Sequence, residues 1–261
     1  MFGLAGLTAL VTGAGSGIGA ATCTALAELG ASVVVADIAE DRCRQVADGV
    51  RERGGSAEVM RLDVTAEDDW RRAVDVIGAG LGRLDILVNN AGICLNVPLL
   101  EMSLAQWRRQ QAVNLDGVFL GTKAAIPLLK AAGGGSIVNV SSTSGLVGNG
   151  GGMAGYSSTK GAVRLFSKSV ALEFAPFNIR CNSIHPGIVV TPLWQKLFPD
   201  DPDFAVLTDD LNIPAKMDRH IPLGRAGEPR EIAASIAFLC TAEAAFMTGA
   251  ELVVDGGTVA V

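Results

Sequence analysis

Short apolar runs alternate with helix-like segments from one end of the chain to the other, and this alternation restricts the fold more than any other feature. Residues 8–12 form an apolar run that leads into glycines, and the alanine-rich segment 18–29 that follows ends at Gly30. This order predicts a β-turn-α unit. Residues 32–37 contain three consecutive valines and predict a second buried strand, which ends in an acid.

The rest of the chain repeats this alternation. Five more strands are predicted at residues 57–63, 84–90, 135–142, 179–184 and 251–255, with helices around 40–53, 66–80, 103–132 and 154–174. No linker divides the 261 residues into two independently patterned halves. We therefore predict one α/β domain over residues 1–261, with a doubly wound, seven-stranded parallel sheet and helices on both faces. Such sheets bind ligands at the carboxyl ends of their strands.

Charge and hydropathy restrict the partners and the location. The formal net charge is -6, and no cluster of Lys or Arg is dense enough to follow a phosphate backbone, so nucleic acid is not expected as a partner. The first residues lack the basic segment and apolar core of a secretion signal, and no apolar run reaches the roughly 18 residues that a membrane span needs. We expect a cytoplasmic chain with no membrane partner.

The five cysteines and two histidines do not predict a metal site. The cysteines are odd in number and widely spaced, without a Cys-x-x-Cys pair, so we expect reduced and mostly buried thiols. His185 and His220 lack further ligands at suitable spacing. Structural or substrate-lining roles are expected for both.

The glycine run after the first strand predicts a phosphate site. Residues 12–19 fit Thr-Gly-x-x-x-Gly-x-Gly rather than G-x-G-x-x-G. Positions without a side chain let the backbone turn sharply and approach a pyrophosphate at the positive end of the following helix. The alternative is a glycine turn that serves close packing alone, as in many other α/β proteins.

Asp37 predicts which dinucleotide binds. It ends the second strand 18 residues after Gly19, where an acid can accept hydrogen bonds from both hydroxyls of an adenosine ribose. A 2′-phosphate would be repelled by this carboxylate, and residues 14–16 and 38 include no Arg or Lys to compensate. We therefore predict NAD rather than NADP. The alternative is an ordinary solvent-facing aspartate at a strand end.

Tyr156 and Lys160 predict acid–base chemistry. Residues four apart share one face of a helix, so the lysine ammonium is expected within a few ångströms of the phenol oxygen. A charge ~4 Å away supplies roughly 4 kcal/mol at an effective dielectric of about 20. That energy would lower the tyrosine pKa from about 10 by two to three units. The alternative is a chance Tyr-x-x-x-Lys on a surface helix.

Taken together, these motifs resemble the short-chain dehydrogenase/reductase family over nearly the whole chain. The matching segments, in chain order, are residues 12–19, Asp63-Val64, residues 89–92, Asn114, Ser142, Tyr156 with Lys160, Asn182, Pro186-Gly187 with Thr191, and residues 255–257. The resemblance implies a Rossmann-like fold. It also implies a homotetramer built from the helices around 103–132 and 153–175 and the C-terminal strand.

The resemblance further implies four catalytic residues: Asn114, Ser142, Tyr156 and Lys160. Tyr156 would be the acid/base, Ser142 would orient the substrate oxygen, Lys160 would lower the tyrosine pKa and bind the nicotinamide ribose, and Asn114 would hold a proton-relay water. Ser142 lies 14 residues before Tyr156, one more than is usual in the family. Ser141 and Ser144 therefore compete for its role.

The cofactor set that follows comes partly from the resemblance. Asp63 and Val64 would lie at the adenine, Asn90 and Gly92 along the cofactor, and Ile188 with Thr191 at the nicotinamide carboxamide. The complete predicted set is Gly13, Ser16, Gly17, Ile18, Gly19, Asp37, Asp63, Val64, Asn90, Gly92, Tyr156, Lys160, Pro186, Gly187, Ile188 and Thr191.

The substrate side predicts an apolar ligand. Residues 188–223 are rich in large apolar groups and are expected to form a lid, or to pack onto the protein or a neighbouring subunit. The glycine-rich stretch 145–155 would leave room beside Tyr156 for a bulky molecule. Cys94 could touch substrate, although a packing thiol is the plainer interpretation. We expect a cyclic, aryl or otherwise apolar secondary alcohol and its ketone, with hydroxysteroids as one subclass.

Three rival functions are weighed. An NADPH-dependent 3-oxoacyl-thioester or β-keto reductase is disfavoured by Asp37, and an isomerising or dehydrating enzyme by the short chain. A non-catalytic, NAD-sensing binding protein would not need a complete acid–base set. We therefore predict an NAD-dependent alcohol dehydrogenase or ketone reductase.

Overall fold

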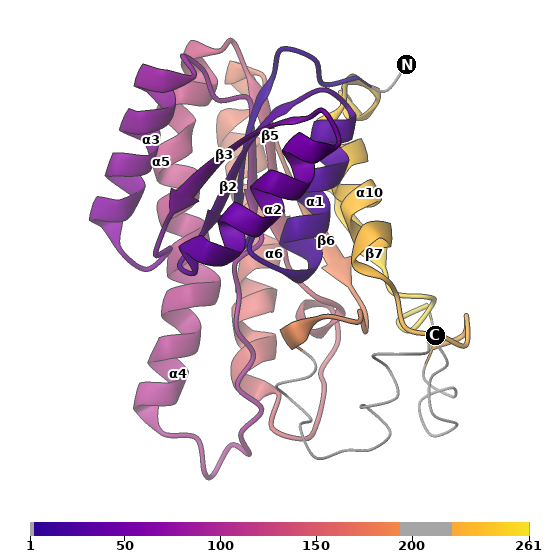
Figure 1. Cartoon of the computed structure of the whole chain (residues 1–261). Helices are drawn as coiled ribbons and strands as arrows, with labels where there is room; N and C mark the ends of the chain where they lie inside the picture. The colour runs from indigo at the N-terminus through magenta and orange to yellow at the C-terminus, as the bar shows by residue number, and fades with distance from the viewer. Residues whose placement is uncertain (1–2, 194–220, 261) are drawn as a thin grey trace.

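A computed structural model describes residues 3–193 and 221–260, and its centre is a seven-stranded parallel sheet in the order β3-β2-β1-β4-β5-β6-β7 (Figure 1). The strands are β1 (Thr8–Thr12), β2 (Ser32–Asp37), β3 (Ser56–Arg61), β4 (Ile86–Asn89), β5 (Gly135–Val140), β6 (Ile179–Pro186) and β7 (Glu251–Val254). The strand order reverses between β1 and β4, which opens a crevice at their carboxyl ends. The predicted single-domain, doubly wound α/β fold is confirmed.

Two layers of helices enclose the sheet. The helices are α1 (Gly17–Glu28), α2 (Glu40–Glu52), α3 (Glu67–Gly80), α4 (Leu104–Gln111), α5 (Gly117–Ala131), α6 (Ala154–Phe174) and α10 (Pro229–Cys240). Figure 1 shows α1 and α10 on one side of the sheet and α3 and α5 on the other. Successive strand residues point to opposite faces, so Val11 joins the core under α1 while its neighbour Leu10 joins the core under α5.

The helix boundaries contain two features that the sequence analysis missed. A π-helical turn, η1 (Ala112–Asp116), separates α4 from α5 within the predicted helix 103–132. Helix α10 was not predicted, although Glu228 and Glu231 form a capping box around Pro229 at its first turn. Helices α1, α2, α3 and α6 lie close to their predicted ranges, and α4, η1 and α5 together occupy the predicted range 103–132.

Residues Leu104–Ala131 form a helical run of 28 residues that is apolar enough to cross a membrane by length and composition alone. Within the protein, 44% of its most apolar window is buried, and Leu129 belongs to the core beneath the sheet. Core helices pass the same test, because they are also long and apolar, so the run carries no argument for a membrane.

Candidate active site

A cavity of about 630 Å³ lies at the carboxyl ends of the strands. Most of the predicted cofactor residues line it: Gly13, Ser16, Gly17, Ile18, Asp37, Asn90, Gly92, Tyr156, Lys160, Pro186, Gly187, Ile188 and Thr191. The predicted catalytic residue Ser142 also lines it, and the remaining one, Asn114, is fully buried nearby. The sheet thus brings residues from positions 13 to 191 into one site.

The turn between β1 and α1 is packed too tightly for side chains. A methyl group built on Gly13 would lie 2.7 Å from the Ala91 Cα, and one on Gly19 would lie 2.3 Å from the Gly13 carbonyl oxygen. The Asn90 amide fixes the turn by donating from Nδ2 to the carbonyls of Thr12 (2.9 Å) and Gly13 (3.1 Å). Backbone therefore forms this wall of the cavity, at the first turn of α1, which suits a phosphate group.

Asp37 closes one end of the cavity. Its Oδ2 accepts from the Gly15 N–H at 3.1 Å and its Oδ1 from the Ala39 N–H at 2.9 Å. A cation that the sequence analysis missed lies nearby: a methyl built on Gly15 would be 2.9 Å from the Cβ of Arg42, an exposed residue of α2. The sequence could have indicated this cation, because Arg42 lies in the first turn of the predicted helix that follows the strand ending at Asp37.

Three predicted cofactor residues do not line the cavity. Gly19 lies behind the glycine turn. The Asp63 Oδ1 accepts from the N–H and the hydroxyl of Thr65. Val64 is 9% exposed, and its carbonyl accepts from the Trp70 indole at 3.0 Å. The adenine contacts of Asp63 and Val64 stay predictions.

Ser142 and Tyr156 both line the cavity, and side-chain hydrogen bonding from Ser142 lowers the pKa of Tyr156. The competing serines have other partners. Ser141 Oγ donates to the Lys160 carbonyl at 2.8 Å, and Ser144 Oγ accepts from Asn149 at 2.8 Å. The geometry favours Ser142 as the neighbour of Tyr156.

The expected pKa shift of Tyr156 is reversed in this structure. Burial is the largest influence and raises the pKa of the phenol, because it disfavours the charged form. Burial also lowers the pKa of Lys160 to about 8. The lysine Nζ lies 5.7 Å from the centroid of the tyrosine ring and donates to the Val140 carbonyl at 2.8 Å. The prediction that Lys160 lowers the tyrosine pKa considered charge alone and left out desolvation.

Asn114 is held in the π-helical turn η1 and fastens the loop that follows β4. Its Oδ1 accepts from the Ile93 N–H and its Nδ2 donates to the Ile93 carbonyl, both at 2.8 Å. A methyl built on Gly92 would lie 3.4 Å from Asn114 Oδ1 and 3.5 Å from Lys160 Nζ. Asn114 and Lys160 therefore approach the same short segment from two helices.

The glycine-rich stretch 145–155 is less open than predicted. Methyl groups on Gly145, Gly152 and Gly155 would approach within 3 Å of the Lys160 backbone, Asn96 and Gln110 respectively, so these glycines permit close packing. Gly150 and Gly151 line the cavity.

Some lining residues were not predicted, among them Asn96, Thr143 and Thr258, whereas Asn149, Met153 and Leu193 belong to the predicted substrate segments 145–155 and 188–223. Cys94 lines the cavity too, with its Sγ 3.9 Å from the Met153 Sδ, and burial raises its pKa to about 11. Thr258 lies close in the chain to Asp255, which packs tightly against Gly187: a methyl group built on Gly187 would lie 2.8 Å from the Asp255 Cβ. Residues 194–220, which include most of the predicted lid and His220, lie outside the described residues.

No metal-binding cluster is found in the described ranges 3–193 and 221–260, where His, Cys, Asp and Glu nowhere gather in threes. All five cysteines are free thiols, and those other than Cys94 are buried.

Comparisons with known proteins agree on the kind of fold and chemistry. Residues 13–259 match the family model described as enoyl-(acyl carrier protein) reductase. A cyclopentanol dehydrogenase from Comamonas sp. (strain NCIMB 9872) is 46% identical over 250 residues, 95% of each chain. A 3-alpha-(or 20-beta)-hydroxysteroid dehydrogenase from Mycobacterium tuberculosis (strain ATCC 25618 / H37Rv) is 43% identical over 260 residues, 98% of this chain and 91% of the relative.

Two solved structures superpose along the whole chain. A short-chain type dehydrogenase/reductase from Mycobacterium marinum gives a TM-score of 0.91 at 38% identity, covering 100% of this chain and 98% of the other. A gluconate 5-dehydrogenase from Burkholderia cenocepacia J2315, in complex with NADP and tartrate, gives a TM-score of 0.90 at 35% identity with the same coverage.

Proposed function

Because this chain belongs to the short-chain dehydrogenase/reductase family, and is thus an oxidoreductase that binds a nicotinamide cofactor, we propose that it interconverts cyclic secondary alcohols and ketones with NAD(H). One observation carries the proposal: the Tyr156–Ser142 pair lies in the same cavity as Asp37 and the glycine turn. When bound, the nicotinamide supplies or accepts the hydride. The protein has to orient the substrate oxygen and move its proton.

Tyr156 is the proposed proton donor and acceptor for the substrate oxygen. Its raised pKa keeps the phenol protonated at neutral pH, which suits donation to a ketone, and the Ser142 hydroxyl opposes that shift. Ser142 is placed to hydrogen-bond the same substrate oxygen. Lys160 would bind the nicotinamide ribose, and Asn114 would hold a proton-relay water.

Asp37 supports NAD as the preferred cofactor. Its carboxylate lines the cavity beside the glycine turn, where it would bind ribose hydroxyls and repel a 2′-phosphate. Two observations bear on binding of NADP: Arg42 lies beside Gly15, and the gluconate 5-dehydrogenase neighbour was solved with NADP.

A cyclic substrate is supported by the relatives and by the lining of the cavity. The cyclopentanol and hydroxysteroid dehydrogenases are both named for ring alcohols. The lining residues Cys94, Met153 and Leu193 are apolar or weakly polar. A small neutral ring would lose less by burial there than an anion would.

A homotetramer is proposed from the outer helices. Leu104, Phe119, Leu165 and Leu172 are large apolar residues of α4, α5 and α6 that are 47–80% exposed. A covering subunit would remove them from water. Size-exclusion chromatography with light scattering tests the assembly, and the cytoplasmic location stays a prediction.

The function itself is tested by a panel of secondary alcohols with NAD and with NADP, followed by the absorbance of the reduced nicotinamide. Turnover of cyclopentanol, cyclohexanol or a hydroxysteroid with NAD supports the proposal. Turnover only of 3-oxoacyl thioesters with NADPH, or only of small anionic hydroxy acids, would refute it.

A further inference from the structure

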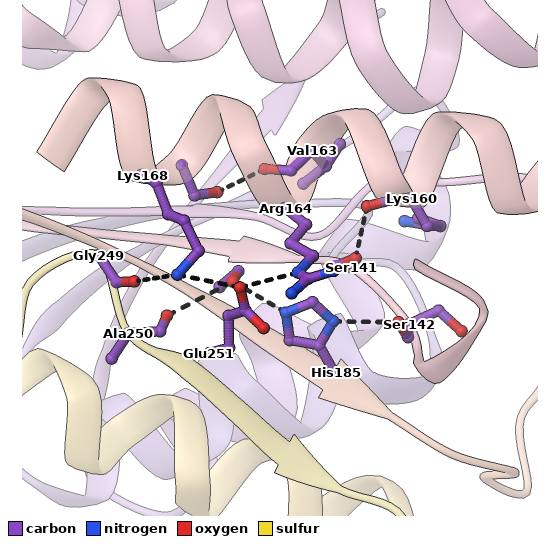
Figure 2. A network of polar contacts seen from close by, with 12 residues as sticks. Ser141, Ser142, Lys160, Val163, Arg164, Lys168, His185, Gly249, Ala250 and Glu251 are labelled. Atoms are coloured by element: carbon purple, nitrogen blue, oxygen red, sulfur yellow. Dashed lines mark hydrogen bonds and ion pairs between the residues drawn. The ribbon is translucent and has the colours of Figure 1, made fainter. Parts of the chain in front are cut away.

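His185 is a buried histidine beside the site that the proposed reaction does not use. It lies on β6 immediately before Pro186, is 0% exposed, and does not line the cavity. Its ring nevertheless connects two parts of the chain (Figure 2): Nδ1 is 3.0 Å from the Ser142 carbonyl oxygen, and Nε2 is 2.9 Å from Ser183 Oγ.

These two contacts determine the protonation of the ring. A carbonyl oxygen only accepts, so Nδ1 must carry a hydrogen and donate it to Ser142. In the neutral ring, Nε2 then accepts from the Ser183 hydroxyl. Burial is the largest influence and lowers the pKa of His185. The hydrogen bond to the Ser142 carbonyl and the charge of Glu251 on β7 raise it, and the charges of Arg164 and Lys160 on α6 lower it. The ring is therefore neutral at physiological pH, with its hydrogen on Nδ1.

The Ser142 carbonyl is the point through which His185 reaches the site. Ser142 follows β5, and its carbonyl also accepts from the Gly145 N–H at 2.9 Å within its own turn. Its hydroxyl accepts from the Ser144 N–H at 3.1 Å and meets Tyr156. Without the hydrogen bond from His185, Ser142 would be held only by its own turn. The Ser142 hydroxyl could then shift relative to Tyr156.

A network of ion pairs lies beside the histidine (Figure 2). Glu251 Oε1 pairs with Arg164 Nε at 2.8 Å and Lys168 Nζ at 2.9 Å, which joins β7 to α6, the helix that carries Tyr156 (Figure 2). His185 thus lies between this frame and the end of β5.

We propose that His185 is a positioning residue: its Nδ1–H holds the Ser142 carbonyl and thereby keeps the Ser142 hydroxyl aligned with Tyr156 and the substrate oxygen. The inference rests on the proposed function, because it requires Ser142 to orient substrate. No bond to His185 is made or broken during turnover.

The test uses three variants with different hydrogen-bonding reach. In His185→Asn the amide nitrogen occupies about the place of Nδ1 and can still donate to Ser142. In His185→Gln the amide extends toward Ser183 instead, and His185→Leu removes both contacts. Misplacement of a reacting group by about 1 Å costs up to ~100-fold in rate. We therefore expect kcat to fall roughly 10- to 100-fold in His185→Gln and His185→Leu, and only a few-fold in His185→Asn.

Two further measurements separate positioning from packing. The pH limb of alcohol oxidation should move to higher pH in His185→Leu, because the hydrogen bond that lowers the Tyr156 pKa is weakened, and should stay in place in His185→Asn. His185→Leu added to Ser142→Ala should give little further loss of kcat, since the two residues act as one unit. Thermal unfolding and NAD titration check that each variant is folded.

The outcomes are distinct. Equal losses in all three histidine variants, or a full additional loss in the Ser142→Ala background, would overturn the positioning role. An unaltered kcat and pH limb in His185→Leu, with kcat reduced in Ser142→Ala, would overturn it while leaving the proposed function standing. Full activity in Ser142→Ala would overturn both the positioning role of His185 and the proposed role of Ser142.

Discussion

The two ends of the cavity are built by different means. At the glycine turn the wall is backbone, and Gly13 and Gly19 leave no room for even one additional carbon atom. At the proposed catalytic end the wall includes polar side chains, among them Ser142 after β5 and Tyr156 and Lys160 on α6. Added atoms should therefore damage the first end, whereas removed atoms should damage the second.

Removal of one oxygen at the catalytic end should have the largest effect. Tyr156→Phe keeps the ring and removes the proton, so we expect kcat to fall about 100- to 10,000-fold, the usual contribution of acid–base catalysis. Steady-state kinetics measure this loss, and fluorescence titration should give an almost unchanged Kd for NAD. Retention of more than about a tenth of the native turnover would contradict the proton-transfer role.

Addition of one carbon at the cofactor end should have the next largest effect. In Gly19→Ala the new methyl would lie 2.3 Å from a backbone carbonyl, so we expect a loss of about 1–3 kcal/mol in unfolding free energy and weaker NAD binding. Gly49→Ala is the matched control, since Gly49 is also helical and its nearest neighbour is an Arg53 nitrogen 3.7 Å away. Chemical denaturation should show the control equal to or more stable than the native protein. Equal stability of the two variants would show that the turn has more room than the structure indicates.

Asp37 is an exception to this contrast, because its side chain lines the cavity at the end where the glycine turn forms the wall. Hydrogen bonds to a charged group contribute about 1.5–3 kcal/mol, so Asp37→Ala should raise the ratio of NADP to NAD efficiency roughly 10- to 100-fold. Arg42→Ala in that background should lower the ratio again, if Arg42 is the cation that meets a 2′-phosphate. Asp41→Ala, an exposed neighbour in the first turn of α2, should change nothing. Equal use of both cofactors by the native enzyme would refute the preference.

The smallest expected effect is a displacement along the pH axis. Burial raises the pKa of Tyr156, so alcohol oxidation, which needs the phenolate, should increase with pH, while ketone reduction should decrease. The Ser142 hydroxyl opposes the shift, so Ser142→Ala should move this limb to higher pH by up to about one unit, or tenfold in rate at a fixed pH. Ser142→Thr keeps a hydroxyl and serves as the control. A limb that moves to lower pH in Ser142→Ala would contradict this assignment.

The fold was more predictable than the electrostatics of the site. The central strands β1, β2 and β4 are runs of mainly apolar residues that are visible in the sequence, and strand ends differ from their predicted positions by at most two residues. Helix α10 was not predicted, although Glu228-Pro229 is a start signal.

The site residues were predictable where local spacing determines their place. Tyr156 and Lys160 are on one helix, so their proximity was evident, but the direction of their pKa shifts depends on burial by the rest of the chain. The contact of His185 with Ser142 joins residues 43 positions apart. It depends on the pairing of β5 with β6, in which Val140 lies beside Ile184, and no local pattern reports that register.

The π-helical turn η1 has a consequence for insertions and deletions. Each residue advances a regular helix by about 100°, so the wide turn adjusts the rotation between α4 and α5. Two amides can then bind the same loop at the same time. Gln110 accepts from the Leu95 N–H at 2.6 Å, and Asn114 accepts from the Ile93 N–H. Deleting Val113 would restore a regular helix, so the helix content measured by circular dichroism would be preserved. The same deletion would turn one of these two amides away from the loop.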